Sequence, residues 1–396
     1  MHRCFEIPEL VDEIVSHIPL LLDQDKPFLA VLARTARLFH NSALNHLWQY
    51  QRSLRPLLLC MPPDLVQEEV VDGKHSLVSN SLPLQTGLLR RLQKFLRPVQ
   101  SSDWERPRRY ARRVRIFSSN SSSFSSDDFP YSAICPLLDV VDDCIFPNLI
   151  KLFWEHSDEN FPHIGLFLSP NITVLAIKCD ASSSLAILSM LPRKCPSVTR
   201  VDMIHPRDHS VTEATRNLVS TFIPQLCCIQ DLHMHIYDMA LLQHIARLPC
   251  LQTLCVLSLP TALPASRRAE KPLFPSLRLL RCENPNPLSM SRLFELCSDN
   301  TLNAFRMTIS HATNVPEVIR QLLAALVNSQ RSSLTELYIR VEPVWDPFQI
   351  ESDGIYTIEC LQPALGFSNL THVRITSNPG FDLDDLAICE MARAWS

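Results

Sequence analysis

Apolar residues in the first 50 residues recur with the period of an α-helix. The spacing i, i+3, i+4, i+7, i+8 and i+11 is filled by Ile7, Leu10, Val11, Ile14, Val15 and Ile18, which places them on one helix face. Two further short helices are predicted, one capped by Asp25 and one capped by Ser42 and ending in Leu47 and Trp48. Three short helices bury little apolar surface by themselves, so residues 1–50 need a partner or the rest of the chain to cover them.

A second pattern, apolar-x-x-apolar-x-apolar, occurs nine times in residues 146–396. The copies begin at Leu149, Ile172, Val198, Ile229, Leu251, Leu277, Leu302, Leu334 and Leu370. Their mean spacing of about 28 residues lies at the long end of the leucine-rich-repeat range. Helical patterns separate the copies, so the fold class is α/β and the sequence predicts a solenoid of βα units with one curved parallel sheet. The alternative is an ordinary α/β domain in which some copies match by chance.

The same pattern predicts which residues of each strand face away from the core. Side chains alternate between the two faces of a strand, so the residues between the apolar positions lie on an open, concave face. This face combines arginines, histidines and a tyrosine, a mixture that recognition surfaces often have. Its candidate binding residues are Arg200, His233, His235, Arg281, Arg306, Tyr338, Arg340 and Arg374.

Residues 51–145 form a connector between these two regions. Six arginines fall between Arg106 and Arg115, and a serine-rich loop follows at 118–128. The arginines alternate with Trp104, Tyr110 and Val114, which favours a solvated helix face leading into a strand over a phosphate-binding segment. A net charge of −4 and the lack of a recognised nucleic-acid motif also predict no binding to nucleic acid.

Composition excludes several other classes of protein. At 396 residues the chain exceeds one ordinary compact core. It contains no run of 18 apolar residues, which predicts no membrane span, and its acidic N-terminus is unlike a signal peptide. We therefore interpret the 14 cysteines as reduced and expect a cytoplasmic or nuclear location, or both.

The motifs of common catalytic sites are missing from the sequence. The six glycines are too dispersed to form a phosphate-binding loop, and neither GxSxG nor HExxH occurs. His233 and His235 would share one side of a strand, as metal ligands can, but we found no thiolate or carboxylate at ligand spacing to join them. The sequence thus predicts two surface histidines, no metal site, no cofactor and no enzyme activity.

The N-terminal region resembles an F-box. Ile7-Pro8 matches the opening apolar-proline pair, Leu10, Ile14 and Ile18 match the helix that follows, and Leu47-Trp48 matches the end of the motif. With the basic connector and the trailing degenerate leucine-rich repeats, the layout is similar to that of the many F-box proteins of mushroom-forming (basidiomycete) fungi.

This resemblance implies a three-helix F-box that docks on a Skp-type adaptor. The adaptor would link the chain to a cullin and its RING partner, and the repeats would select an unknown protein substrate for ubiquitin transfer. Carried over to this sequence, the adaptor-binding positions are Ile7, Pro8, Leu10, Ile14, Ile18, Leu32 and Trp48. The sequence leaves open which of them face the adaptor and which face the internal core of the F-box.

An alternative function is a non-catalytic leucine-rich-repeat scaffold whose N-terminal helices only cap the solenoid. It predicts that Ile7, Leu10 and Ile14 are buried against residues 140–180.

One further expectation concerns the other end of the chain. The final residues MARAWS fall within a repeat helix, which predicts a solenoid truncated at its C-terminus.

Overall fold

The computed structural model describes thirteen stretches of the chain. They are residues 7–18, 25–71, 90–120, 144–155, 161–178, 190–204, 213–260, 273–297, 302–310, 315–330, 333–342, 356–377 and 380–395. The chain divides into two compact units, Met1–Val198 and Thr199–Ser396. The described part is α/β, with eleven strands in its main sheet, four in the first unit and seven in the second.

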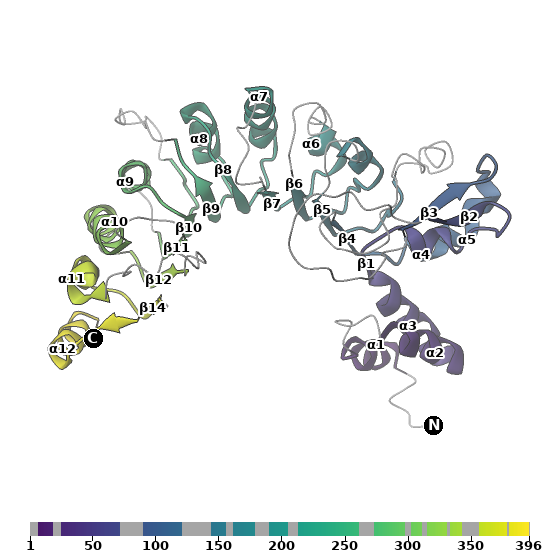
Figure 1. Ribbon diagram of the computed structural model, residues 1–396, viewed down its shortest axis with the longest axis horizontal. Coiled ribbons are helices and arrows are strands. Elements are labelled where there is room, and N and C mark those ends of the chain that lie inside the picture. The colour runs from purple at the N-terminus through teal and green to yellow at the C-terminus, as the bar shows by residue number, and fades with distance from the viewer. Residues whose placement is uncertain are drawn as a thin grey trace. The chain divides into compact units, whose positions relative to one another are not determined.

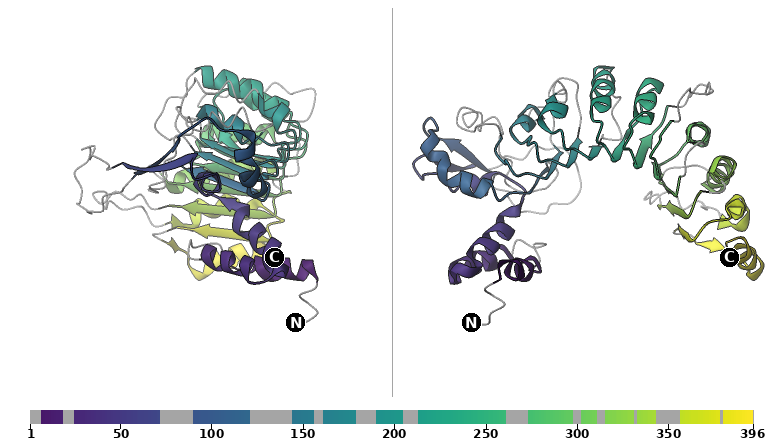
Figure 2. Two further views of the ribbon diagram at one scale, coloured as in Figure 1. Left: turned by 90° about the vertical axis from the view of Figure 1, so that its right-hand side faces the viewer. Right: turned by 180° about the vertical axis from the view of Figure 1, so that it is seen from behind.

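Three helices open the first unit: α1 (Pro8–Ser16), α2 (Asp25–Thr35) and α3 (Arg37–Gln49) (Figures 1 and 2). Both α1 and α2 pack on α3. Their shared core consists of Val11, Val15 and Leu29, with Ile18, Leu32, Leu38, Phe39 and Leu47 partly buried around it. His46 of α3 also contacts the turn that follows α1, because its Nε2 lies 2.8 Å from the carbonyl oxygen of Ile18.

The third helix begins earlier than the sequence predicted. It starts at Arg37, with Ala36 in an extended conformation as its N-cap, whereas we had placed the cap at Ser42. Ser42 lies inside α3 and is buried. The early start has a packing reason, since the first turn of α3 brings Leu38 and Phe39 onto the core shared with α1 and α2.

Helix α3 runs directly into the sheet of the first unit. The strand order there is β1 (Tyr50–Gln51), β4 (Ile116–Asn120), β5 (Lys151–Glu155) and β6 (Val174–Lys178), and the pairings are parallel. The unit also contains α4 (Arg55–Leu58), α5 (Ser101–Ala111), α6 (Leu191–Lys194), the 3-10 helix η3 (Phe161–Leu166) and the antiparallel hairpin of β2 (Val66–Val71) and β3 (Arg90–Phe95). Parallel pairing therefore begins at β1 and β4, before the first predicted repeat.

The sheet of the second unit is also parallel in the described pairings. Its strands are β7 (Arg200–Ile204), β8 (Asp231–His235), β9 (Thr253–Ser258), β10 (Leu279–Glu283), β11 (Ala304–Ile309), β12 (Glu336–Val341) and β14 (His372–Thr376). The helices are α7 (Glu213–Phe222), α8 (Met239–Ala246), α9 (Pro287–Leu296), α10 (Val315–Gln330), α11 (Ile358–Leu361) and α12 (Asp385–Ala394), with η5 (Ile223–Gln225) and η6 (Gln362–Gly366). A small parallel pair, β13 (Tyr356–Thr357) and β15 (Phe381–Asp382), completes it. Helices α8, α9 and α10 lie on the same side of their strands (Figure 1).

The nine predicted repeats coincide with nine strands. In every copy the strand begins two residues after the first apolar residue of the pattern. Those nine first residues, Leu149 through Leu370, are each 4 % exposed or less. Buried and exposed side chains alternate in β8 and β10, which bury only their second and fourth residues, whereas β6 and β9 each bury three consecutive residues. The prediction of a parallel sheet built from strand–helix units is therefore confirmed.

Polar side chains connect two of the repeats to the repeat before them. The Asn171 amide donates a 3.0 Å hydrogen bond to the Pro147 carbonyl, and the Ser276 hydroxyl donates a 2.6 Å bond to the Pro249 carbonyl. Backbone carbonyls in these turns would otherwise lack partners, which is costly near a core. The Pro170-Asn171 and Pro275-Ser276 turns thus stabilise the stacking of neighbouring repeats.

Two other expectations concern the connector and the membrane. The basic segment forms α5 followed by β4, so its predicted helix-to-strand reading is confirmed. Most of the serine-rich loop, residues 121–128, lies outside the described residues, as does the start of the helical pattern at 184–189. Among the helices that the structure describes, none is long and apolar enough to cross a membrane.

Candidate interaction surfaces

Helix α1 presents an uncovered apolar stripe. Val11 and Val15 face the internal core, while Ile7, Leu10 and Ile14 are between 43 % and 47 % exposed. The spacing i, i+3, i+7 places these three on one helix face. Single exposed apolar residues are common on proteins, but a stripe along one helix indicates a surface that another molecule can cover.

Helix α2 carries a second exposed apolar pair that sequence reasoning missed. Phe28 and Val31, which are not among the predicted docking residues, are both more than half exposed. The buried residues described in α2 are Leu29 and Ala33. A spacing of three residues puts Phe28 and Val31 on the same face, and this spacing was the available signal.

The other predicted docking residues divide between surface and interior. Pro8 is exposed in the first turn of α1. Ile18 and Leu32 are partly buried against the core of the three helices. Trp48 is 8 % exposed and stacks on Tyr110 of α5, with 4.7 Å between ring centroids and 23° between ring planes. In this structure, then, Trp48 joins α3 to α5.

Two arginines that follow α5 also contact α3. The guanidinium of Arg113 donates to the carbonyl and side-chain oxygens of Asn41, at 3.3 and 3.1 Å, and to the side-chain oxygen of Asn45. The backbone N–H of Arg115 donates to the Gln49 carbonyl at 2.9 Å. At least these two arginines of the basic segment therefore make structural contacts within the first unit.

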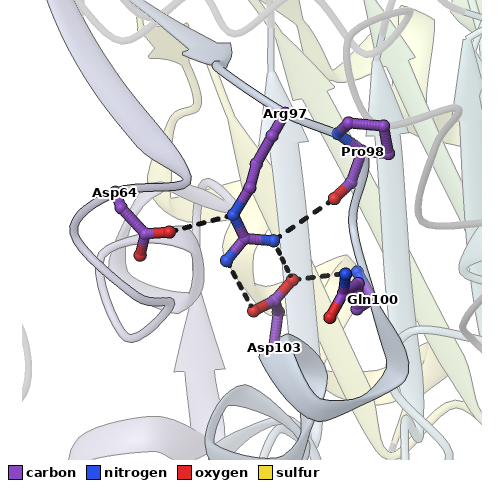
Figure 3. Close-up of polar contacts among 5 residues, drawn as sticks. All are labelled: Asp64, Arg97, Pro98, Gln100 and Asp103. Atoms are coloured by element: carbon purple, nitrogen blue, oxygen red, sulfur yellow. Dashed lines mark hydrogen bonds and ion pairs between the residues drawn. The ribbon is translucent and has the colours of Figure 1, made fainter.

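An ion-pair network fixes the start of α5 (Figure 3). Arg97 forms a bidentate pair with Asp103, with N–O distances of 2.7 and 2.9 Å, and its Nε donates to Asp64 at 2.9 Å. Asp103 also accepts the backbone N–H of Gln100, as in a capping box. The hydrogen bonds from Arg97 hold the pKa of Asp103 below its ordinary value. The network thereby positions the helix that carries Tyr110.

The predicted binding residues of the second unit lie on the face of its sheet opposite α8, α9 and α10 (Figure 1), called the helix-free face below because no described helix covers it. The strand register brings the middle residues of seven strands into one row: Asp202, His233, Cys255, Arg281, Arg306, Tyr338 and Arg374. Neighbouring strands are about 4.8 Å apart, so residues in this row are direct neighbours. The row runs from mixed groups at β7–β9 to cationic and aromatic groups at β10–β14.

The arginines of strands β11, β12 and β14 on this face already have partners. The guanidinium of Arg374 lies 5.6 Å from the ring centroid of Tyr338, a cation–π arrangement. Arg306 lies 3.5 Å from Glu336, and Arg340 lies 3.4 Å from Glu342. These are partly exposed pairs, which contribute little to stability and leave the guanidinium groups able to exchange partners.

The remaining predicted residues lie at the β7–β9 end. Arg200 forms a 3.0 Å ion pair with Asp202 on the same strand. His235 lies 2.8 Å from the hydroxyl of Ser258 and stacks on Tyr237. His233 and His235 thus have different surroundings, although both belong to β8.

His233 has chemically distinct neighbours that sequence reasoning did not combine. A nitrogen of its ring, the Cys255 thiol and a Glu283 carboxylate oxygen all lie within 4.8 Å of one another. Burial lowers the pKa of His233, against a smaller opposite effect of Asp202, and burial raises the pKa of Cys255 to about 12. The signal for this grouping was the position of each residue within its repeat. That position places His233, Cys255 and Glu283 on one face of adjacent strands.

Comparison with known proteins adds no family assignment. No protein-family model matches the chain, and no curated protein matches it.

Proposed function

We propose that the chain is the substrate-recognition subunit of an SCF-type (Skp–cullin–F-box) ubiquitin ligase. In this proposal α1–α3 form the F-box and dock on a Skp-type adaptor, and the helix-free face of the repeat sheet binds a protein substrate. The chain itself performs no catalysis, since ubiquitin transfer belongs to the cullin-bound partners. It would act in the cytoplasm, the nucleus or both.

The observation that carries the proposal is the exposed apolar stripe of α1. A three-helix unit with an unpaired stripe is suited to bury that stripe against a partner, as in other cases of helix docking. The second exposed pair, Phe28 and Val31 on α2, adds apolar surface to the same small unit. Among the seven docking positions implied by the F-box resemblance, Ile7, Pro8, Leu10 and Ile14 are exposed.

The capped-solenoid alternative is disfavoured by the same residues. It requires Ile7, Leu10 and Ile14 to be buried against residues 140–180, yet all three are exposed. Within the described residues α1 packs instead on α3. The scaffold function remains the second candidate, because the helix-free face would serve either role.

For the substrate we propose a protein segment with acidic side chains. Arg281, Arg306 and Arg374 lie in one row of the β10–β14 sheet, with Tyr338 between the last two. Arginine and tyrosine are enriched at interface hot spots, and guanidinium groups pair well with carboxylates. Glu336 is paired with Arg306, and Glu342 is paired with the neighbouring Arg340, so an acidic segment would compete with both carboxylates.

Affinity capture with a purified Skp-type adaptor tests the adaptor part of the proposal. The wild-type chain is expected to retain the adaptor, and the Pro8→Glu/Leu10→Glu variant to lose it. A matched control is Leu288→Glu on α9, because Leu288 is the same residue type and is 67 % exposed. If the wild-type chain is folded by circular dichroism and retains no adaptor, the scaffold function is supported instead.

A further inference from the structure

Three side chains from neighbouring strands meet on the helix-free face of the second unit. His233 of β8 and Cys255 of β9 are direct cross-strand partners. Arg281 of β10 is opposite Cys255, and Glu283 lies two residues further along, on the same side of the sheet. A ring nitrogen, a thiol sulfur and a carboxylate oxygen are thereby held within 4.8 Å of one another.

The imidazole of His233 is oriented and incompletely satisfied. Its Nδ1 lies 3.9 Å from a carboxylate oxygen of Asp202 on β7. Its Nε2 is shielded from solvent and has no hydrogen-bond partner among the described residues. Leaving a buried polar nitrogen without a partner costs free energy, so this position requires an explanation. An electron-pair acceptor at Nε2 would remove the penalty.

We propose that His233, Cys255 and Glu283 bind a zinc ion. Imidazole, thiolate and carboxylate are the three ligand types that zinc takes in proteins, and three protein ligands leave a fourth position open. Magnesium and calcium prefer sites made of oxygen atoms alone, which the thiol and the imidazole argue against. The proposal does not depend on adaptor binding, since every ligand lies in the second unit.

The three ligand atoms are close enough for one zinc ion to join them after a small movement. Ligand atoms at about 2.0–2.3 Å from zinc lie roughly 3.5 Å from one another, so a present spacing of at most 4.8 Å must contract by no more than about 1.3 Å. Rotation of the Glu283 side chain supplies much of that movement, because its carboxylate is at the end of a flexible chain that is only partly buried. The nearby Asp202 fits the outer-shell role of a carboxylate that orients a zinc-bound histidine.

The surrounding charges are compatible with a divalent ion. Two cations face the site, Arg200 and Arg281. The first is paired with Asp202 at 3.0 Å, and the second has an exposed side chain that water can screen. With the Cys255 thiol ionised on binding, the thiolate and the Glu283 carboxylate balance the two charges of zinc.

Bound zinc would have two consequences for the second unit. It would cross-link β8, β9 and β10, three strands of the sheet that are otherwise joined by backbone hydrogen bonds and core packing. It would also place an open coordination position on the helix-free face, beside the row of arginines. A histidine or carboxylate of a bound protein partner has the chemistry to fill that position.

Cobalt titration of the metal-free chain tests the site directly. Cobalt substitutes for zinc, and a thiolate ligand gives it a charge-transfer absorption in the near ultraviolet. The cysteines that are exposed among the described residues, which would bind cobalt adventitiously, are first replaced by serine: Cys227, Cys228, Cys250 and Cys389. In this background the absorption is expected to saturate at one equivalent and to disappear when zinc is added.

Variants assign the ligands. Cys255→Ser should abolish the absorption, and Glu283→Gln should weaken binding by more than the roughly 10–100-fold typical of outer-shell changes. Asp202→Asn should fall within that range. The matched control is Cys282→Ser, because Cys282 is a buried thiol of β10 whose sulfur lies 3.7 Å from the Arg306 carbonyl. The proposal is overturned if the parent chain shows no absorption, or if Cys255→Ser retains it.

Discussion

The contact between Trp48 and Tyr110 gives Trp48 a structural role in the first unit. Substitutions at these two residues can therefore be compared with substitutions at the exposed residues of α1. Trp48 is 8 % exposed and its ring stacks on Tyr110 at 4.7 Å. Stacked aromatic pairs contribute about 0.5–1.5 kcal/mol beyond the apolar area they bury. The variant Tyr110→Leu keeps an apolar side chain and removes the stacking. We expect the free energy of unfolding of the first unit to fall by about that amount.

The full loss of the indole should cost more. Truncation of a buried tryptophan to alanine typically destabilises a protein by about 3–5 kcal/mol. Urea unfolding followed by circular dichroism measures both Tyr110→Leu and Trp48→Ala. At urea concentrations where the variants remain folded, their affinity for a Skp-type adaptor should equal that of the wild-type chain.

The exposed stripe should behave in the opposite way. Leu10 and Ile14 are 43 % and 47 % exposed. Complete burial of such a side chain contributes about 1.5–3 kcal/mol, so covering the exposed part of both contributes about 1.4–2.7 kcal/mol. Leu10→Ser/Ile14→Ser should therefore weaken adaptor binding about 10- to 100-fold, measured by isothermal titration calorimetry.

One combination of results would refute this reasoning. If Trp48→Phe left the unfolding curve unchanged but abolished adaptor binding, Trp48 would face the adaptor and the stacking on Tyr110 would have no structural importance. The reverse outcome for Leu10 and Ile14, a large loss of stability with unchanged affinity, would place the α1 stripe in the interior of the unit.

Three further predictions concern the connector and the repeats. Since Arg97 lowers the pKa of Asp103, their pair stabilises the folded state at pH values above the ordinary pKa of 3.8, and this stabilisation is lost as the pH falls through the lower pKa of the folded state. The difference in free energy of unfolding between wild type and Arg97→Met should therefore shrink below about pH 4 in urea titrations. A difference that stays constant with pH would contradict this prediction. Leu254→Ala should destabilise the second unit by about 2–5 kcal/mol in urea unfolding, because Leu254 is fully buried in β9; an unchanged midpoint would contradict the assigned register. Arg306→Glu/Arg374→Glu should abolish retention on a polyglutamate resin at low ionic strength, and binding equal to wild type would argue against an acidic partner.

The strands of the repeats were predictable because one physical signal marks them. Each copy carries a fully buried first residue, such as Leu251 or Leu334, two positions before the strand. Core burial on one face and stacking of neighbours both depend on this residue, so its period survives in the sequence.

Strand β1 and the start of α3 were not predicted from the sequence, because both depend on tertiary contacts. Strand β1 has two residues, Tyr50–Gln51, and becomes a strand only because β4 lies beside it. The start of α3 at Arg37 depends on packing against the other two helices, which outweighed the capping preference of Ser42. No local pattern carries either fact.

The candidate sites show the same division. The face on which His233, Cys255 and Glu283 lie follows from period-two alternation, and all three could be placed there from sequence. Their mutual distances could not, because Glu283 is diagonal to Cys255 and the β8–β9 register shifts between Met234 and His235. Likewise, helical spacing grouped the apolar residues of α1 and α2 but did not show which of them α3 covers.

Hydrogen–deuterium exchange of the chain, measured with and without a Skp-type adaptor, tests whether α1 and α2 are the docking surface. We expect a stable complex in which backbone amides of α1 and α2, residues 8–16 and 25–35, exchange more slowly, while the exchange of β10–β14 is unchanged. A complex that protects the repeat sheet and leaves α1 and α2 unprotected would contradict the proposed docking surface. So would a folded chain that forms no complex with the adaptor.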